Sequence, residues 1–176
     1  MAKKIVFTGG FSVGKTTTIQ MLHHLGYAVA PESSESVVNE FRLSKGSYPW
    51  EDEQSLLRFH EDIFNKQIES EENINSDITF FDRGIPDRLA FLKFDNLPIP
   101  QKMLEHAKSC GYDKVFFLEG DNSSYVTASH RPYGLSDSLR FVELVKEIYS
   151  NLGHDLIVIP FCPKEERLKI ILEKIK

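Results

Sequence analysis

Gly9-Gly10-Phe11-Ser12-Val13-Gly14-Lys15-Thr16 is the stretch that decides the fold, because it fits the pattern G-x-x-x-x-G-K-[ST]. The residues before it, 3–8, form a short, apolar and β-branched run without helical periodicity, which is typical of a buried strand. The residues after it place Ile19 and Leu22 on one face of a helix, and Gly26 would end that helix. A strand therefore leads into the glycine-rich loop, and a helix leaves it.

This context indicates a phosphate-binding P-loop. Glycines let the backbone turn tightly, so that successive N–H groups converge on phosphate oxygens, and the N-terminus of the following helix adds partial positive charge. We expect ATP with Mg²⁺ here: Lys15 would reach the β- and γ-phosphates, and the Thr16 hydroxyl would hold the metal. A glycine-rich turn that binds nothing is disfavoured, because strand, loop, Lys-Thr pair and helix are all in register. The residues assigned to nucleotide binding are Gly9, Gly10, Phe11, Ser12, Val13, Gly14, Lys15, Thr16 and Thr17.

The length and composition predict one domain, residues 1–176. They do not determine the oligomeric state. The 176 residues carry a formal net charge of −5, which argues against a nucleic-acid partner, because general nucleic-acid binders normally carry a basic patch. No segment has the length of a membrane span, so we expect no membrane partner and no signal peptide. Cys110 and Cys162 lack metal-ligand spacing, which favours free thiols in a reducing compartment and hence a cytoplasmic protein.

Short apolar runs alternate with amphipathic runs along the rest of the chain. Further strands are predicted at residues 27–30, 78–81, 114–118 and 156–159. Helices are predicted at residues 34–43, 51–72, 87–94, 101–109, 141–151 and 164–176. Strands that alternate with helices imply a parallel sheet between helical layers, and therefore an α/β fold.

Asp82 directly follows the apolar run 78–81 and so ends a predicted strand. Ligands in open α/β sheets gather at the carboxyl ends of the strands, which would bring Asp82 close to the Mg²⁺ expected at Thr16. A carboxylate there, acting directly or through water, suits a hard cation that keeps part of its hydration shell. Thr16 and Asp82 are thus the predicted metal ligands; the alternative for Asp82 is an acid that only begins a turn.

Glu32 follows another predicted strand and so belongs to the same rim of the sheet. A carboxylate facing an acceptor hydroxyl could accept its proton during phosphoryl transfer. The sequence supports equally well an acid that stabilises a helix N-terminus through the helix dipole, because Ser33 to Ser36 provide that context. Glu35 is a weaker rival for the role of base.

Arginines complete the predicted catalytic set, because phosphoryl transfer needs cations at the developing oxygen charge. Arg83 follows Asp82 and would face the same cleft. Arg131 lies in the polar, irregular segment after residue 120 and would belong to a lid over the γ-phosphate; Arg140 competes for this role but is expected on the following helix. The alternative for each is a surface or ion-pairing arginine. The predicted catalytic residues are Lys15, Glu32, Asp82, Arg83 and Arg131.

Three segments resemble the small single-domain AAA-type P-loop ATPase/kinase family: residues 8–17, 30–32 and 81–87. That family includes the ribosylnicotinamide kinase domain of a bifunctional NAD-metabolism regulator. Residues 149–153 and 160–167 are similar to its C-terminal pattern, so the resemblance spans nearly the whole chain. A more distant likeness is to deoxynucleoside kinases, whose strand-end Glu acts as base and whose Glu-Arg-Ser motif corresponds to Asp82-Arg83-Gly84.

The resemblance implies a three-layer P-loop NTPase fold with a five-stranded parallel sheet of nucleoside/nucleotide-kinase type. It also implies a lid at about residues 120–140 and an adenine flanked by the loop at residues 161–164. The chain departs from the pattern in one respect: only Arg131 is clearly placed in the lid, where many such kinases have two or more arginines.

Other P-loop classes are disfavoured. Asn65-Lys66-Gln67-Ile68 lacks the Asp that reads guanine, no LSGGQ-like signature of transporter ATPases is present, and the chain is too short for a ring-forming AAA+ machine. We therefore expect a kinase that transfers the ATP γ-phosphate to a hydroxyl of a small, nucleoside-like acceptor. An NTP hydrolase or an ATP-gated regulatory module without an acceptor is the alternative. A regulatory module needs only the phosphate site, whereas Glu32 and the cluster at residues 82–87 favour a kinase.

Overall fold

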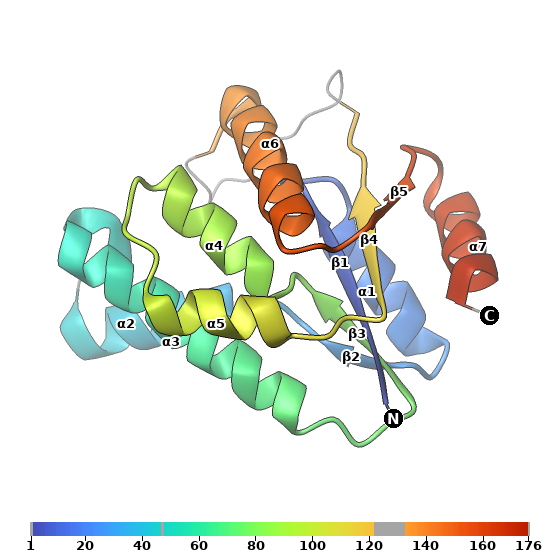
Figure 1. The fold of residues 1–176 in the computed structure, drawn as a ribbon, viewed down its shortest axis with the longest axis horizontal. Helices are drawn as coiled ribbons and strands as arrows, with labels where there is room; N and C mark the ends of the chain where they lie inside the picture. Colours follow the sequence, from blue (N-terminus) through green and yellow to red (C-terminus); the bar gives the residue numbers. More distant parts are fainter. Residues whose placement is uncertain (1, 47, 122–132, 176) are drawn as a thin grey trace.

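Five parallel strands form the centre of the molecule in the computed structural model, which describes residues 2–46, 48–121 and 133–175 (Figure 1). The strands are β1 (Lys3–Gly9), β2 (Ala28–Ala30), β3 (Ile78–Asp82), β4 (Lys114–Leu118) and β5 (Leu156–Ile159). Their order is β2-β3-β1-β4-β5, and every neighbouring pair is parallel. The prediction of an α/β fold with a five-stranded parallel sheet is confirmed.

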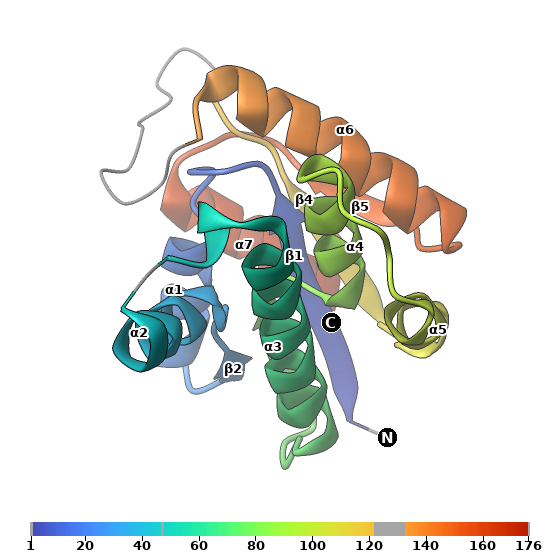
Figure 2. The same cartoon turned by 90° about the vertical axis from the view of Figure 1, so that its left-hand side faces the viewer.

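Helices cover both faces of this sheet (Figures 1 and 2). On one face lie α1 (Lys15–His24) and α7 (Lys164–Ile175). The other face carries α3 (Glu53–Glu72), α4 (Ile85–Phe94), α5 (Gln101–Ser109) and α6 (Leu135–Asn151). A further helix, α2 (Ser34–Lys45), packs on α3 and is joined to it through the short 3₁₀ helix η1 (Pro49–Glu51). Three layers result, as the sequence predicted.

Alternation along the central strand divides the interior into two cores. Ile5 and Phe7 of β1 point toward α1 and α7, whereas Val6 between them points toward the opposite helical layer. Phe7 stacks between Phe80 and Phe116 of the neighbouring strands, with ring centroids 5.7 and 5.4 Å apart. Because both faces of the strand are buried, it reads in the sequence as a continuous apolar run.

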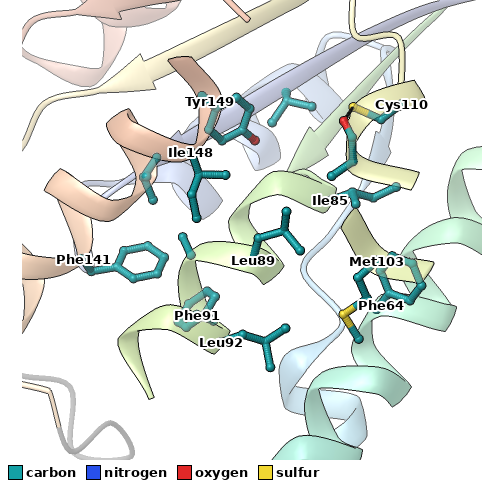
Figure 3. Close-up of a cluster of buried hydrophobic side chains, with 14 of the residues drawn as sticks. Phe64, Ile85, Leu89, Phe91, Leu92, Met103, Cys110, Phe141, Ile148 and Tyr149 are labelled. Atoms are coloured by element: carbon teal, nitrogen blue, oxygen red, sulfur yellow. Dashed lines mark hydrogen bonds between the residues drawn. The ribbon is translucent and has the colours of Figure 1, made fainter. Parts of the chain in front are cut away.

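The second core packs around α4, every residue of which is buried except Lys93 (Figure 3). Leu89 and Phe91 face Phe141 and Ile148 of α6, while Leu92 lies on the side of α3 and α5. A helix enclosed by other helices has little freedom to move, because interiors are close-packed. This rigid helix begins only three residues after β3 and thus lies next to the predicted site.

Two helices begin earlier than the sequence predicted. Helix α4 begins at Ile85 rather than at residue 87, because Pro86 fits the first turn, where no hydrogen-bonded N–H is needed. Helix α6 begins at Leu135, so residues 135–140 of the expected lid are helical; Asp137 accepts a hydrogen bond from the Gly134 N–H and caps the helix. Residues 122–132 of that lid lie outside the described residues. Among the helices that are described, none is both long and apolar enough to span a membrane.

Candidate functional site

The backbone of the P-loop depends on two glycines. Gly9 has a φ of +137°, and a Cβ there would lie 2.5 Å from the carbonyl oxygen of Leu118 on the adjacent strand. Gly14 has a φ of +86° and forms the N-cap of α1. Residues with a side chain rarely adopt such φ values, and at Gly9 there is also no room for one. The loop conformation therefore requires the glycines of the motif.

Lys15 lies across the inside of this loop. Its ammonium group donates a hydrogen bond to the carbonyl oxygen of Gly10 at 2.6 Å, and the side chain is buried. Burial, followed by the charge of Arg83, lowers the pKa of Lys15 from 10.5 to about 7. A phosphate group at the loop would supply the anion that the buried ammonium group needs.

Thr16 and Asp82 come together as the sequence predicted for a metal site. The Thr16 hydroxyl donates to Asp82 Oδ2 at 2.9 Å, and burial raises the pKa of Asp82 above its ordinary value. The other oxygen, Oδ1, is buried and has no hydrogen-bond partner in the described part of the chain. A hydroxyl beside an unsatisfied carboxylate oxygen fits Mg²⁺, which prefers oxygen ligands. In the described residues no group of three or more His, Cys, Asp or Glu side chains could hold a metal ion. A Mg²⁺ at Thr16 and Asp82 would keep several waters and also bind phosphate oxygens, as is usual for this cation.

Glu32 lies between two buried arginines at the same edge of the sheet. Its carboxylate is 3.5 Å from Arg83 Nε and accepts a hydrogen bond from Arg88 Nη2 at 3.3 Å. Arg88 was not among the residues predicted for the site. Its signal was an Asp-Arg pair within the otherwise apolar run of residues 85–94, since a charge in a fully buried helix requires a partner.

Arg83 is held by backbone and side chains together. It has a φ of +74°, and its N–H donates to the Phe7 carbonyl oxygen at 2.9 Å. Its Nη1 donates to the Gly9 carbonyl oxygen at 3.2 Å and to Asp87 Oδ1 at 3.0 Å. Burial opposes the charge on Arg83, but the carboxylates of Glu32 and Asp87 outweigh it and raise the pKa of Arg83. A fixed cation thus lies directly against the P-loop.

Asp87 anchors this arrangement. It is fully buried, and besides Arg83 it accepts hydrogen bonds from the Thr8 hydroxyl at 2.6 Å, the Tyr149 hydroxyl at 2.7 Å and the Gly84 N–H at 2.9 Å. A buried carboxylate with this many donors is well satisfied, and it fixes the groups around it. Through Asp87, the end of β1, the start of α4 and helix α6 all define where Arg83 lies.

Two polar side chains from distant parts of the chain support the P-loop from outside. Ser138 Oγ in α6 accepts a hydrogen bond from the Phe11 N–H at 3.0 Å. Arg167 Nη1 in α7 donates to the Val13 carbonyl oxygen at 2.6 Å. In the sequence, Arg167 belongs only to a stretch that resembles the C-terminal pattern of a known family, and Ser138 carries no signal. No local pattern connects residues so far apart with the loop.

Four of the five predicted catalytic residues meet at the carboxyl edge of the sheet: Lys15, Glu32, Asp82 and Arg83. Arg131 lies outside the described residues, and its role stays a prediction. Arg140 lies on α6, as expected, with its guanidinium 4.8 Å from the Phe94 ring and its Nη2 3.5 Å from Asn96 Oδ1. These contacts are with the end of α4 rather than with the charged cluster.

A family model described as an AAA domain matches residues 4–167 of the chain. A comparison with curated proteins finds no match. Among solved structures, the chain is similar to deoxyadenosine kinase from M. mycoides with bound dCTP, at 15% identity and a TM-score of 0.67 over 98% of each chain.

Two thymidylate kinases give similar values. The enzyme from Ehrlichia chaffeensis is 16% identical with a TM-score of 0.63 over 99% of each chain. The enzyme from Candida albicans is 14% identical with a TM-score of 0.67, over 99% of this chain and 91% of the other. At these identities the likeness establishes the fold, and it confirms the predicted P-loop architecture with a parallel sheet.

Proposed function

Because the chain belongs to the AAA-domain family of P-loop proteins, we propose that it is a kinase that transfers the γ-phosphate of ATP to a hydroxyl group of a nucleoside-like molecule. The observation that carries the proposal is the position of Glu32. Its carboxylate is next to Arg83, on the edge of the sheet where the P-loop and Asp82 lie. A carboxylate in this place can take the proton of a bound acceptor hydroxyl, whereas a protein that only binds a nucleotide needs no such group.

The residues around the P-loop would bind the triphosphate. Lys15 would turn from the Gly10 carbonyl toward the β- and γ-phosphates, and Thr16 and Asp82 would hold Mg²⁺. The metal, when bound, would neutralise charge on the phosphate oxygens. Arg83 is fixed against the Gly9 carbonyl, close enough to the loop to stabilise negative charge that develops during transfer.

Glu32 would accept the proton of the acceptor hydroxyl. A base must be positioned within hydrogen-bonding reach of that proton, and the two arginines restrict where this carboxylate can lie. Arg88 belongs to the buried helix α4, and Arg83 is paired with Asp87 of the same helix, so the base has a rigid support. Arg131, on the segment between β4 and α6, would add a cation over the γ-phosphate.

The charges of the cluster favour a neutral alcohol as acceptor. Arg83 pairs with Glu32 and Asp87, and Arg88 pairs with Glu32, so both guanidinium groups already have a carboxylate. An acceptor that carries its own phosphate would have to displace Glu32 from these arginines. This favours the nucleoside substrate of a deoxyadenosine kinase over the nucleotide substrate of a thymidylate kinase as the guide to the acceptor class.

ATP consumption with and without acceptors tests the proposal. A panel of deoxynucleosides, ribonucleosides and nicotinamide riboside should contain compounds that accelerate ADP formation and become phosphorylated. Glu32→Gln should lower the transfer rate by about 10²–10⁴-fold, because a general base contributes roughly that factor. Its affinity for ATP should hardly change. Glu61→Gln, on the exposed face of α3, is the matched control and should leave both quantities unchanged.

Two other outcomes would contradict the proposed kinase activity. If ATP is hydrolysed at one rate whatever compound is added, and Glu32→Gln leaves that rate untouched, the protein is an NTP hydrolase. If ATP binds but is not consumed under any of these conditions, an ATP-gated regulatory module takes its place.

A further inference from the structure

Arg167 brings a guanidinium group from α7 to the outer side of the P-loop. The side chain is only 5% exposed. Its Nη1 donates to the Val13 carbonyl oxygen at 2.6 Å, and its Nη2 lies 3.5 Å from the Glu119 carbonyl oxygen at the end of β4. A Cβ on Gly14 would lie 3.0 Å from the same Nη1. The guanidinium therefore packs directly against the peptide group that joins Val13 to Gly14.

The position of that carbonyl determines where the next N–H points. A trans peptide group is planar, so the carbonyl of Val13 and the N–H of Gly14 point in opposite directions. A carbonyl held toward α7 therefore leaves this N–H turned away from α7. N–H groups that converge inside a P-loop are the ones that bind phosphate oxygens.

The charge of Arg167 acts in the same direction. In the described part of the chain its hydrogen bonds go to main-chain carbonyls, and its Nε has no partner. A buried cation bonded to carbonyl dipoles, and not to a carboxylate, keeps a positive potential beside the loop. A triphosphate in the loop would lower the energy of this cation, because charges interact strongly at low dielectric.

We infer that Arg167 is a positioning residue of the nucleotide site: it orients the Val13–Gly14 peptide for phosphate binding and ties the P-loop to the last helix. The inference rests on the proposed binding of a nucleoside triphosphate and names a residue outside the loop motif that this binding requires. An orienting role makes a prediction that a purely structural role does not make. The binding of the ligand's phosphates, and not of its base, should depend on Arg167.

Calorimetric titration of two variants tests the inference. Arg167→Gln removes the charge and keeps a hydrogen-bond donor, whereas Arg167→Lys keeps the charge. The probes are Mg²⁺–ATP and Mg²⁺–tripolyphosphate, the second of which has phosphates only. Arg167→Gln should bind both about tenfold or more weakly than wild type, the factor expected for a lost charged hydrogen bond. Arg167→Lys should lose less, and Lys169→Gln, an exposed cation on the same helix, should lose nothing.

Each other outcome has a definite meaning. If wild type itself binds no ATP, the proposed function fails before the variants are compared. If wild type binds ATP and Arg167→Gln binds both probes equally well, the inference is overturned. It is also overturned if ATP is lost while tripolyphosphate is bound as before, since Arg167 would then act on the nucleoside part. If Arg167→Gln does not fold, as judged by its unfolding midpoint without ligand, Arg167→Lys decides. This variant keeps the charge but not the planar guanidinium group. Affinity equal to that of wild type for both probes would overturn the orienting role.

Discussion

The charged side chains of this site are buried, and they compensate one another's charges. Lys15, Arg83 and Arg88 lie among Glu32, Asp82 and Asp87, and all six take part in an ion pair, a hydrogen bond or both. Removing one member of an ion pair among Glu32, Asp87, Arg83 and Arg88 leaves the other charge uncompensated and is strongly destabilising, whereas Lys15 and Asp82 form hydrogen bonds but no ion pair in the described residues. Substitutions at these positions must therefore be tested for stability as well as for activity, and Lys15 gives the clearest case.

Lys15→Met should make the ligand-free protein more stable at neutral pH. Below pH 7 the lysine is charged in both states, and the folded protein carries the full penalty of burying that charge. Between about pH 7 and 10.5 the folded protein has released a proton that the unfolded chain still binds, so wild-type stability rises with pH. The advantage of Lys15→Met should thus shrink by about 1.4 kcal/mol per pH unit across this window.

Urea denaturation of both proteins across this pH range measures the difference. Titrating groups far from Lys15 are common to the two proteins and cancel in the comparison, whereas the pKa of Asp82, which the Lys15 charge lowers, rises further in the variant. A difference that does not vary with pH would mean that the Lys15 ammonium is not disfavoured by burial. In the same samples Lys15→Met should bind ATP weakly or not at all, because the phosphates lose their main cationic partner.

Among the structural elements, the unit of β1, P-loop and α1 depends most on its neighbours. Strand β1 pairs with β3 and β4 on either side, so the start of the loop is enclosed by backbone from both strands. Helix α1 then begins at Lys15 with Gly14 as its N-cap. Close approach of main chains, rather than side-chain packing, sets the shape of this unit, and it is therefore sensitive to single Cβ atoms.

Gly9→Ala should destabilise the protein more than Gly26→Ala does. Both glycines have positive φ, at +137° and +89°, so both variants incur backbone strain. Only at Gly9 would the new Cβ meet an atom, the Leu118 carbonyl oxygen at 2.5 Å; at Gly26 nothing lies within 4 Å. We expect an additional loss of about 1–3 kcal/mol for Gly9→Ala, the usual cost of overpacking.

Chemical denaturation compares these two variants, and ATP titration shows whether the loop survives. Gly26→Ala should bind ATP like wild type, because Gly26 lies at the far end of α1. Equal losses of stability in the two variants would show that β1 and β4 can separate to admit the methyl group.

At the level of the whole molecule, the parallel sheet collects residues from all parts of the chain at one edge. Glu32 follows β2, Asp82 ends β3 and the P-loop follows β1, and these three strands are neighbours in the order β2-β3-β1. Ligands of open α/β sheets bind at this edge. A nucleotide bound there would lie at the ends of three neighbouring strands, so its binding should stabilise the folded protein.

Mg²⁺–ATP should raise the unfolding temperature by mass action, and Asp82→Asn should remove most of the part that depends on Mg²⁺. At a ligand concentration of about 100 times Kd, binding stabilises the folded state by roughly 2.7 kcal/mol. Loss of a group that acts on a metal through one of its ligands, such as a carboxylate that holds a metal-bound water, typically weakens metal affinity or activity by about 10–100-fold. The ligand-free stability of Asp82→Asn should not fall below that of wild type, because burial raises the pKa of Asp82 and so disfavours its charged form.

Thermal unfolding with ATP, in Mg²⁺ or in excess EDTA, measures both effects. Asp77→Asn, an exposed acid just before β3, is the matched control and should behave like wild type. If Asp82→Asn kept the full Mg²⁺-dependent rise in unfolding temperature, Asp82 would only begin a turn and would not bind the metal.

Local patterns were enough to predict the strands, most helices and the P-loop fold. The run 114–118 and the run 156–159 became β4 and β5 with unchanged bounds, because buried parallel strands are continuous apolar segments. The glycines and the Lys-Thr pair of the P-loop are likewise close together in the sequence, and so the local sequence determines the geometry of the loop. Helix starts were less accurate: α6 begins six residues before the predicted residue 141, in a polar segment that resembles a loop.

Contacts between distant residues were decided only when the chain folded. Ser138 reaches Phe11 across 127 positions, and Arg167 reaches Val13 across 154, so no periodicity or motif could reveal either pair. The pairing of Glu32 with Arg83 and Arg88 depends in the same way on β2 lying beside β3. Sequence determines local conformation through backbone preference and hydrophobic period, whereas which charges are buried together follows from strand order and helix packing. In this protein, the local sequence determined the phosphate-binding loop. The charged residues that surround the loop and form the proposed acceptor site were brought together only by the tertiary structure.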